Sequence, residues 1–263
     1  MHLTDRIQQI VVTLSYLACL VGSMIGVGVF GGTPIASAAG GALASDATLL
    51  APASAAFSIW TVVYAGLAGY TVLQWFPTPA SADRQRSLRL PVAGTMLLNA
   101  AWILVVQAGW LWVSVAVIAV LLALLSRVLV ILMRTRASGM LDRLFLDGAL
   151  GVYLGWVCVA TAANVAAALT SSGFDGAGID PNWWAVAALV AVGGVGIALA
   201  VRSKGRVAVA AAIAWGLAWI AVARWDGAPH SVPTAVAAGA AAVVVLGVAL
   251  SLRVRAATSA ARA

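Results

Sequence analysis

The sequence predicts an all-α, polytopic membrane bundle of about eight transmembrane helices. Of the 263 residues, 63% are hydrophobic and only 9% are charged, whereas a soluble domain carries about 25% charged residues. The apolar residues are grouped in runs of about twenty, the helix length that crosses a bilayer core of about 30 Å. Strands of a membrane barrel would alternate apolar and polar residues over about ten positions, and the runs do not alternate. The lipid bilayer is therefore the first expected partner.

The first four spans lie before residue 134. They cover residues 9–30, 53–76, 91–108 and 110–133. Pro77 and Pro79 end the second span, because proline cannot continue a helix beyond its first turn. Gly109 alone divides the third span from the fourth, since almost no polar residue lies near it.

The last four spans cover residues 144–170, 183–201, 206–224 and 232–252. Gly176, Gly178 and Pro181 separate the fifth span from the sixth, and Pro229 and Pro233 precede the eighth. The final three runs are rich in alanine, valine and glycine, which permit close contact between helices. We expect them to pack against the preceding spans or against another copy of the chain.

The basic residues predict the orientation of the chain. With eight spans, thirteen of them fall in loops on one side: Arg6, Arg84, Arg86, Arg89, Arg134, Arg136, Arg143, Arg202, Lys204, Arg206, Arg253, Arg255 and Arg262. Arg224 alone falls on the other side, and Arg127 lies within the fourth span. Lysine and arginine are retained in cytoplasmic loops. We therefore expect a multi-pass protein of the cell membrane with both termini cytoplasmic, and no nucleic-acid partner despite the charge of +7.

Tryptophan is abundant, with eleven residues. Six of them lie near span ends, where an aromatic belt at the membrane interface explains them: Trp75, Trp110, Trp112, Trp183, Trp184 and Trp225. Trp60, Trp102 and Trp156 lie deeper. Because helical residues three or four apart share a face, Trp60 lies over Tyr64 and Asn99 over Trp102.

A stripe of the fifth span carries the same mixture, since Trp156, Ala160 and Asn164 are each four residues apart. Amides and phenols in hydrocarbon must find partners, and two interpretations meet that need. The polar groups can join helices in a packing seam, or they can surround a ligand pocket in the outer half of the membrane. The spacing alone leaves both open.

Three segments carry a family resemblance. They are Phe57-Ser58-Ile59-Trp60-Thr61-Val62-Val63-Tyr64, Leu98-Asn99-Ala100-Ala101-Trp102, and Tyr153-Leu154-Gly155-Trp156 followed by Ala160-Thr161 and Asn164. In order and spacing they resemble the signatures of the TspO/MBR family, the tryptophan-rich sensory or translocator proteins. Gly109-Trp110 and Leu20-Val21-Gly22-Ser23 add to the likeness, which covers about residues 8–170.

The resemblance implies a five-helix domain over residues 1–175 and a three-helix extension over residues 176–263. It further implies a pocket, closed by the first loop, for a planar or sterol-like hydrophobic ligand such as a porphyrin. The implied ligand-binding residues are Gly22, Trp60, Tyr64, Asn99, Trp102, Trp110, Trp156, Ala160 and Asn164. Ser54, Ser58, Ser114 and Val152 depart from the family pattern, so the ligand's identity does not carry over.

Several function classes remain to be weighed. No acid–base pair, nucleophile motif or metal-ligand spacing is present, so we expect neither an enzyme nor a resident metal or cofactor beyond a tetrapyrrole ligand. We prefer a ligand-binding sensory or regulatory protein. Transport of tetrapyrroles or other small hydrophobic molecules, and breakdown of a bound porphyrin as proposed for relatives, stay open as alternatives.

Two further features have structural interpretations. The Gly22-to-Gly26 spacing suits close helix contact and is compatible with a homodimer. Arg127 and Asp147 are the ionisable residues expected at membrane depth, where an ion pair or snorkelling to the interface is favoured over a proton or substrate path.

Overall fold

The computed structural model describes residues 3–29, 32–76 and 82–260. Throughout these ranges the regular structure is helical, and eight helical segments are long and apolar enough to cross a membrane. The predicted fold class is thus confirmed. The predicted features at Phe30, Pro77, Pro79 and Arg262 lie outside the described residues.

The chain divides into two compact units. The first comprises residues 1–39 and 60–154, and the second comprises residues 40–59 and 155–263. This division reflects packing, whereas the predicted boundary between residues 175 and 176 rests on family length and stays a prediction.

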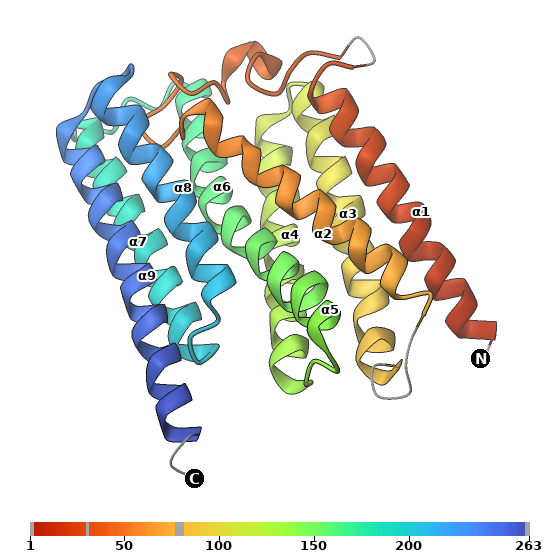
Figure 1. Ribbon diagram of the computed structural model, residues 1–263. Helices are drawn as coiled ribbons and strands as arrows, with labels where there is room; N and C mark the ends of the chain where they lie inside the picture. The colour runs from red at the N-terminus through yellow and green to blue at the C-terminus, as the bar shows by residue number, and fades with distance from the viewer. Residues whose placement is uncertain (1–2, 30–31, 77–81, 261–263) are drawn as a thin grey trace. The chain divides into compact units, whose positions relative to one another are not determined.

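Helices of the first unit are the first four spans and the beginning of the fifth (Figure 1). They are α1 (Leu3–Gly26), α2 (Ile59–Leu73), α3 (Ala82–Gln107), α4 (Leu111–Arg134), α5 (Met140–Asp142) and the π-helical turn η3 (Arg143–Gly148). The third helix, α3, contacts both α1 and α4. Apolar side chains such as Val12, Leu67 and Leu121 are buried between these helices.

The break at Gly109 is present as predicted. Helix α3 ends at Gln107 and α4 begins at Leu111, and Gly109 has a φ of +76°. Residues with a Cβ rarely adopt this left-handed conformation. A glycine at this point therefore allows two apolar helices to be joined by a very short turn.

The start of α3 corrects the sequence prediction. We expected the span to begin at residue 91, with three arginines in the preceding loop, but the helix begins at Ala82 and continues through Pro91. Arg84 and Arg89 are buried on this helical extension. A prediction from hydropathy excludes these first turns of α3 from the span because they are charged. Arginines that are paired with carboxylates can nevertheless be buried in a helix.

The second unit contains the rest of the helices. They are η2 (Ser54–Ser58), α6 (Ala149–Ser171, of which residues from 155 onward belong here), α7 (Pro181–Arg202), α8 (Val207–Asp226) and α9 (Val232–Ala260), while η1 (Ala38–Gly41) lies at the division. Helix α9 contacts both α7 and α8. Gly196 lies against Val245, and Gly216 against Val159. Small residues thus allow close helix contacts here, as the composition predicted.

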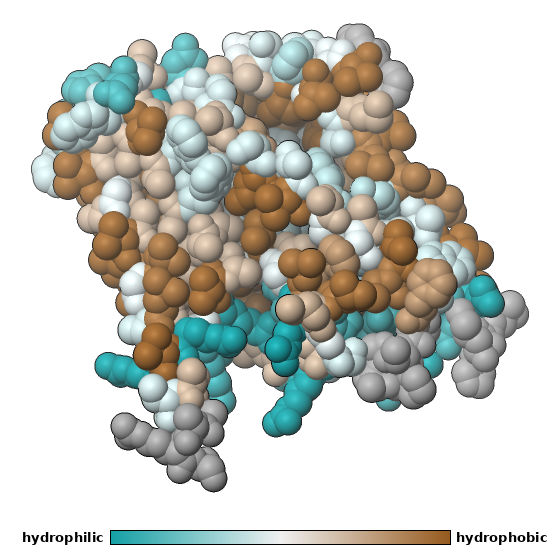
Figure 2. All heavy atoms as spheres, viewed as in Figure 1, coloured by the Kyte–Doolittle hydropathy of each residue, from teal (hydrophilic) through white to brown (hydrophobic). Residues whose placement is uncertain are grey.

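The outward surfaces fit a lipid environment. Large apolar side chains such as Val190, Val236 and Val243 are exposed. In Figure 2, brown apolar residues run along the helices of each unit, and teal polar residues gather at helix ends. The chain is a multi-pass membrane protein by length, composition and surface.

Candidate functional site

A link between an amide and a phenol joins three helices of the first unit. Asn99 on α3 donates from Nδ2 to the Tyr64 hydroxyl on α2, at 3.0 Å. The same nitrogen lies 3.5 Å from Sγ of Cys19 on α1. Asn99 is only 1% exposed. Its side chain is therefore fixed where α1, α2 and α3 meet.

Aromatic rings extend this link along α2. The Trp60 and Tyr64 rings are stacked, with centroids 5.3 Å apart and planes 21° apart. Trp60 also meets Tyr153 edge to face at 5.7 Å. The Tyr16 hydroxyl donates to the Tyr64 carbonyl oxygen at 3.3 Å. The geometry confirms that Trp60 and Tyr64 share a helix face.

Tyr153 completes the group, which we call the aromatic–amide cluster and define as Tyr16, Cys19, Trp60, Tyr64, Asn99 and Tyr153. The buried Tyr153 hydroxyl donates to the Thr95 carbonyl oxygen at 3.1 Å. Neither Tyr16 nor Cys19 was among the predicted site residues. Their signal was available, because they are three residues apart on α1 and so share a face. The local sequence of α1 does not, however, indicate which helices these two residues contact.

Gly22 brings α1 and α3 together beside this cluster. A Cβ at Gly22 would lie 3.1 Å from the Ala100 Cβ, and one at Gly26 would lie 3.1 Å from Ile103. Both glycines therefore serve a helix contact inside the chain. The spacing of the two glycines is explained by this contact within the chain. It therefore does not support a homodimer.

Two predicted tryptophans lie elsewhere in the first unit. Trp102 is half-buried on α3, one turn beyond Asn99. Trp110 is the residue before α4, and its side chain is 63% exposed. That exposure fits the interfacial belt. Trp110 is predicted twice, as belt and as site residue, and its contact with a ligand stays a prediction.

The remaining predicted residues belong to the second unit. Trp156 is 2% exposed on α6, and its ring meets the Phe57 ring edge to face at 5.5 Å. Ala160 is half-buried and Asn164 is buried on the same helix. The cluster brings together Trp60, Tyr64 and Asn99, with Gly22 on the adjacent helix contact. A hollow shared with Trp156, Ala160 and Asn164 stays a prediction.

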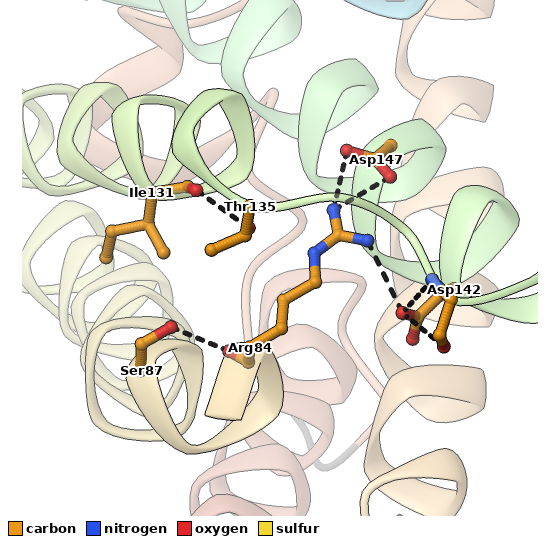
Figure 3. Close-up of polar contacts among 7 residues, drawn as sticks. Arg84, Ser87, Ile131, Thr135, Asp142 and Asp147 are labelled. Carbon is orange, nitrogen blue, oxygen red and sulfur yellow. Dashed lines mark hydrogen bonds and ion pairs between the residues drawn. The ribbon is translucent and has the colours of Figure 1, made fainter. Parts of the chain in front are cut away.

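A buried ion network lies near the N-terminal end of α3. Arg84 donates to both carboxylate oxygens of Asp147 at 2.8 Å and lies 3.4 Å from Asp142 (Figure 3). Arg89 and Arg86 pair with Asp5 of α1. Of the two alternatives for Asp147 and Arg127, an ion pair or snorkelling, Asp147 forms an ion pair, with Arg84 as its partner. Arg127 is exposed on α4, and its snorkelling stays a prediction. The π-helical turn η3 carries Asp147, and α3 supplies the arginine that it meets.

Comparison with known proteins gives one family. A model of the family described as TSPO-like protein matches residues 9–250. The match runs through the last three spans as well as the first five. No curated protein and no solved structure matches the chain.

Proposed function

The chain belongs to the TSPO-like protein family, and from that premise we propose that it is a ligand-binding sensory or regulatory membrane protein. The ligand is a hydrophobic planar molecule, such as a porphyrin, a sterol or an isoprenoid. The site is centred on the aromatic–amide cluster. Indole and phenol faces supply stacking area, and the amide orients the ligand by hydrogen bonding.

One observation carries this proposal: the Trp60–Tyr64 stack adjoins a buried amide whose donor reaches the Tyr64 hydroxyl. A seam that only joined helices would need the hydrogen bond but no stacked indole. Trp60 is half-buried, so the protein does not enclose the whole residue. The polar groups of the cluster are phenol, amide and thiol, which suit binding better than acid–base catalysis.

Saturable quenching of tryptophan emission by protoporphyrin tests the proposal in purified protein in detergent. We expect Trp60→Leu to weaken binding by about tenfold, because one aromatic contact contributes about 1–3 kcal/mol when a ring is stacked. Asn99→Ala should also weaken it. Trp183→Phe is the matched control, since Trp183 is 68% exposed on α7. Its replacement should remove one tryptophan's share of the emission without changing the affinity for porphyrin.

Equal affinity in the wild type, Trp60→Leu and Asn99→Ala would contradict this location of the site. Quenching of the same strength by an unrelated helical membrane protein would show that porphyrin merely partitions into the detergent. A parallel titration with a sterol that competes with porphyrin separates the two ligand classes.

Transport is a second candidate, favoured by the buried network of Arg84 with Asp142 and Asp147. Ionisable residues inside a membrane span commonly mark substrate or proton paths. In sealed vesicles, porphyrin uptake that disappears in Asp147→Asn while binding persists would favour transport over sensing. Loss of bound porphyrin in the dark would instead favour a degrading enzyme.

A further inference from the structure

Helix α8 holds the chain segment that leads into α2. The segment consists of residues 45–56, and it lies with α8 in the second unit. The backbone N–H of Ala53 donates to the Trp219 carbonyl oxygen at 3.2 Å, and the Trp215 indole N–H donates to the Ala56 carbonyl oxygen at 3.0 Å. The 3₁₀ turn η2, which begins within the segment and runs to Ser58, also contacts α8.

Arg224 makes the strongest attachment. Its side chain is 0% exposed. One terminal nitrogen donates to the Thr48 carbonyl oxygen at 3.1 Å and to that of Pro229 at 3.1 Å, and the other donates to the Ser45 carbonyl oxygen at 2.5 Å. All three acceptors are backbone carbonyl groups. Withdrawal of the segment would take two of them from a buried charge, which is costly.

This attachment accounts for an exception in the charge pattern. Arg224 was the single basic residue that eight spans placed on the side opposite to thirteen others. It is not a loop residue but lies in the last turn of α8. The guanidinium offers five N–H donors in a fixed fork, which suits it to several carbonyl groups at once. Lysine has no comparable fork.

We propose that α8 is a dock for residues 45–56 and that Arg224 is a positioning residue for ligand binding at the aromatic–amide cluster. The segment continues through η2 into Ile59, the first residue of α2, and then into Trp60. Fixing the segment therefore fixes the beginning of the helix that carries Trp60 and Tyr64. The part concerning ligand affinity rests on the proposed function, whereas the dock itself does not.

Hydrogen exchange followed by mass spectrometry tests the dock directly. In Arg224→Gln we expect the amides of residues 45–56 to exchange about tenfold faster. A hydrogen bond to a charged group contributes about 1.5 kcal/mol or more, which corresponds to at least about a tenfold change in an equilibrium constant. Trp215→Phe keeps an aromatic ring and removes the N–H donor, so exchange should rise near Ala56. Arg202→Gln is the control, since Arg202 is exposed at the end of α7, and it should change neither.

Ligand binding tests the positioning role. Protoporphyrin affinity should fall several-fold in Arg224→Gln and partly recover in Arg224→Lys. Coupling between sites is reciprocal, so saturating protoporphyrin should slow exchange of residues 45–56 in the wild type. The slowing should be smaller in Arg224→Gln than in the wild type, whereas a residue that only stabilised the fold would leave its size unchanged.

The outcomes separate the two parts. Unchanged exchange in folded Arg224→Gln and Trp215→Phe overturns the dock. Faster exchange with unchanged affinity, and no slowing by porphyrin, overturns the positioning role. If the wild type binds no ligand saturably, the proposed function and the positioning role fall together, while the exchange data still decide the dock. If Arg224→Gln does not fold, Trp215→Phe and Arg224→Lys decide both parts.

Discussion

Polar side chains inside the first unit form hydrogen bonds between segments that are far apart in the sequence. Gln9 and Gln74 each donate from Nε2 to the other residue's carbonyl oxygen, at 2.6 and 3.0 Å. The Trp75 indole N–H donates to the Thr13 hydroxyl at 3.1 Å. With the link from Asn99 to Tyr64, these pairs tie α2 and the turn that follows it to α1 and α3. Each is worth little alone, but an orphaned buried group costs about 1–3 kcal/mol.

A double-mutant cycle on Tyr64→Phe and Asn99→Ala measures the central link. We expect a coupling energy of about 0.6 kcal/mol, the average for hydrogen bonds between membrane helices. The free energy of unfolding by sodium dodecyl sulfate in mixed micelles provides the measurement. Additive effects of the two substitutions would show that the hydrogen bond contributes nothing to stability.

Arg84 should matter far more for folding than Arg127. Arg84→Met leaves the buried Asp142 and the half-buried Asp147 without this guanidinium, which should cost about 3–5 kcal/mol. Arg127→Met is the matched control, because Arg127 is exposed on α4 and surface changes usually stay within about 0.5 kcal/mol. Equal losses of unfolding free energy in the same micelles would contradict the network in Figure 3.

At the residue scale, the sequence indicated which side chains share a helix face. It did not indicate which residues of other helices they contact. The spacing of Trp60 and Tyr64 predicted their stack because both lie on one helix. The meeting of Asn99 with Cys19 depends on how α3 packs against α1. Pairings of this kind join residues 80 positions apart, and no local pattern specifies them.

Glycines determine how closely the elements approach. A Cβ at Gly66 on α2 would lie 2.1 Å from the Ala149 Cβ, and one at Gly69 would lie 2.3 Å from the Phe145 ring. Helix α2 therefore approaches Ala149 and the Phe145 ring closely at these two glycines. By contrast, a Cβ at Gly194 on α7 would meet nothing within 4 Å.

Gly66→Ala and Gly194→Ala form a matched pair on two spans. The first should lower the unfolding free energy by about 1–3 kcal/mol, because overpacking forces backbone shifts. The second should be neutral or stabilising by up to about 1 kcal/mol through helix propensity. Thermal denaturation of the two variants in one detergent makes the comparison. Equal midpoints would refute the tight α2 contact.

The start of α3 shows where element prediction reached its limit. Apolar length located the span, since only its apolar part resembles a bilayer-crossing run. Its first turns carry Arg84 and Arg89, whose charges are offset by Asp142, Asp147 and Asp5 from other elements. The helix could not be extended through these arginines without knowing their partners.

The thickness of the bilayer determines how long each transmembrane helix must be. For this reason the eight spans were predictable from length and hydropathy. The two compact units were not predictable. Residues 40–59 precede α2 in the chain but pack in the second unit, where Arg224 and Trp215 hold them. This assignment depends on hydrogen bonds across more than 150 sequence positions.

Orientation is a prediction at this scale. Thr258→Cys, near the end of α9, should react with a membrane-impermeant maleimide only after the cells are permeabilised, whereas Asp175→Cys should react in intact cells. Both positions are exposed, and the native Cys19 and Cys158 are buried. The reverse pattern would place both termini outside and contradict the orientation drawn from the basic residues.

The proposal that a planar hydrophobic ligand binds at the aromatic–amide cluster is tested most directly by photo-crosslinking, with the adducts mapped by mass spectrometry. A photoreactive porphyrin should attach to peptides from residues 57–73 and 90–107, and unlabelled porphyrin should abolish those adducts. Adducts spread over outward-facing residues such as Val236 and Val243, and insensitive to the competitor, would contradict it.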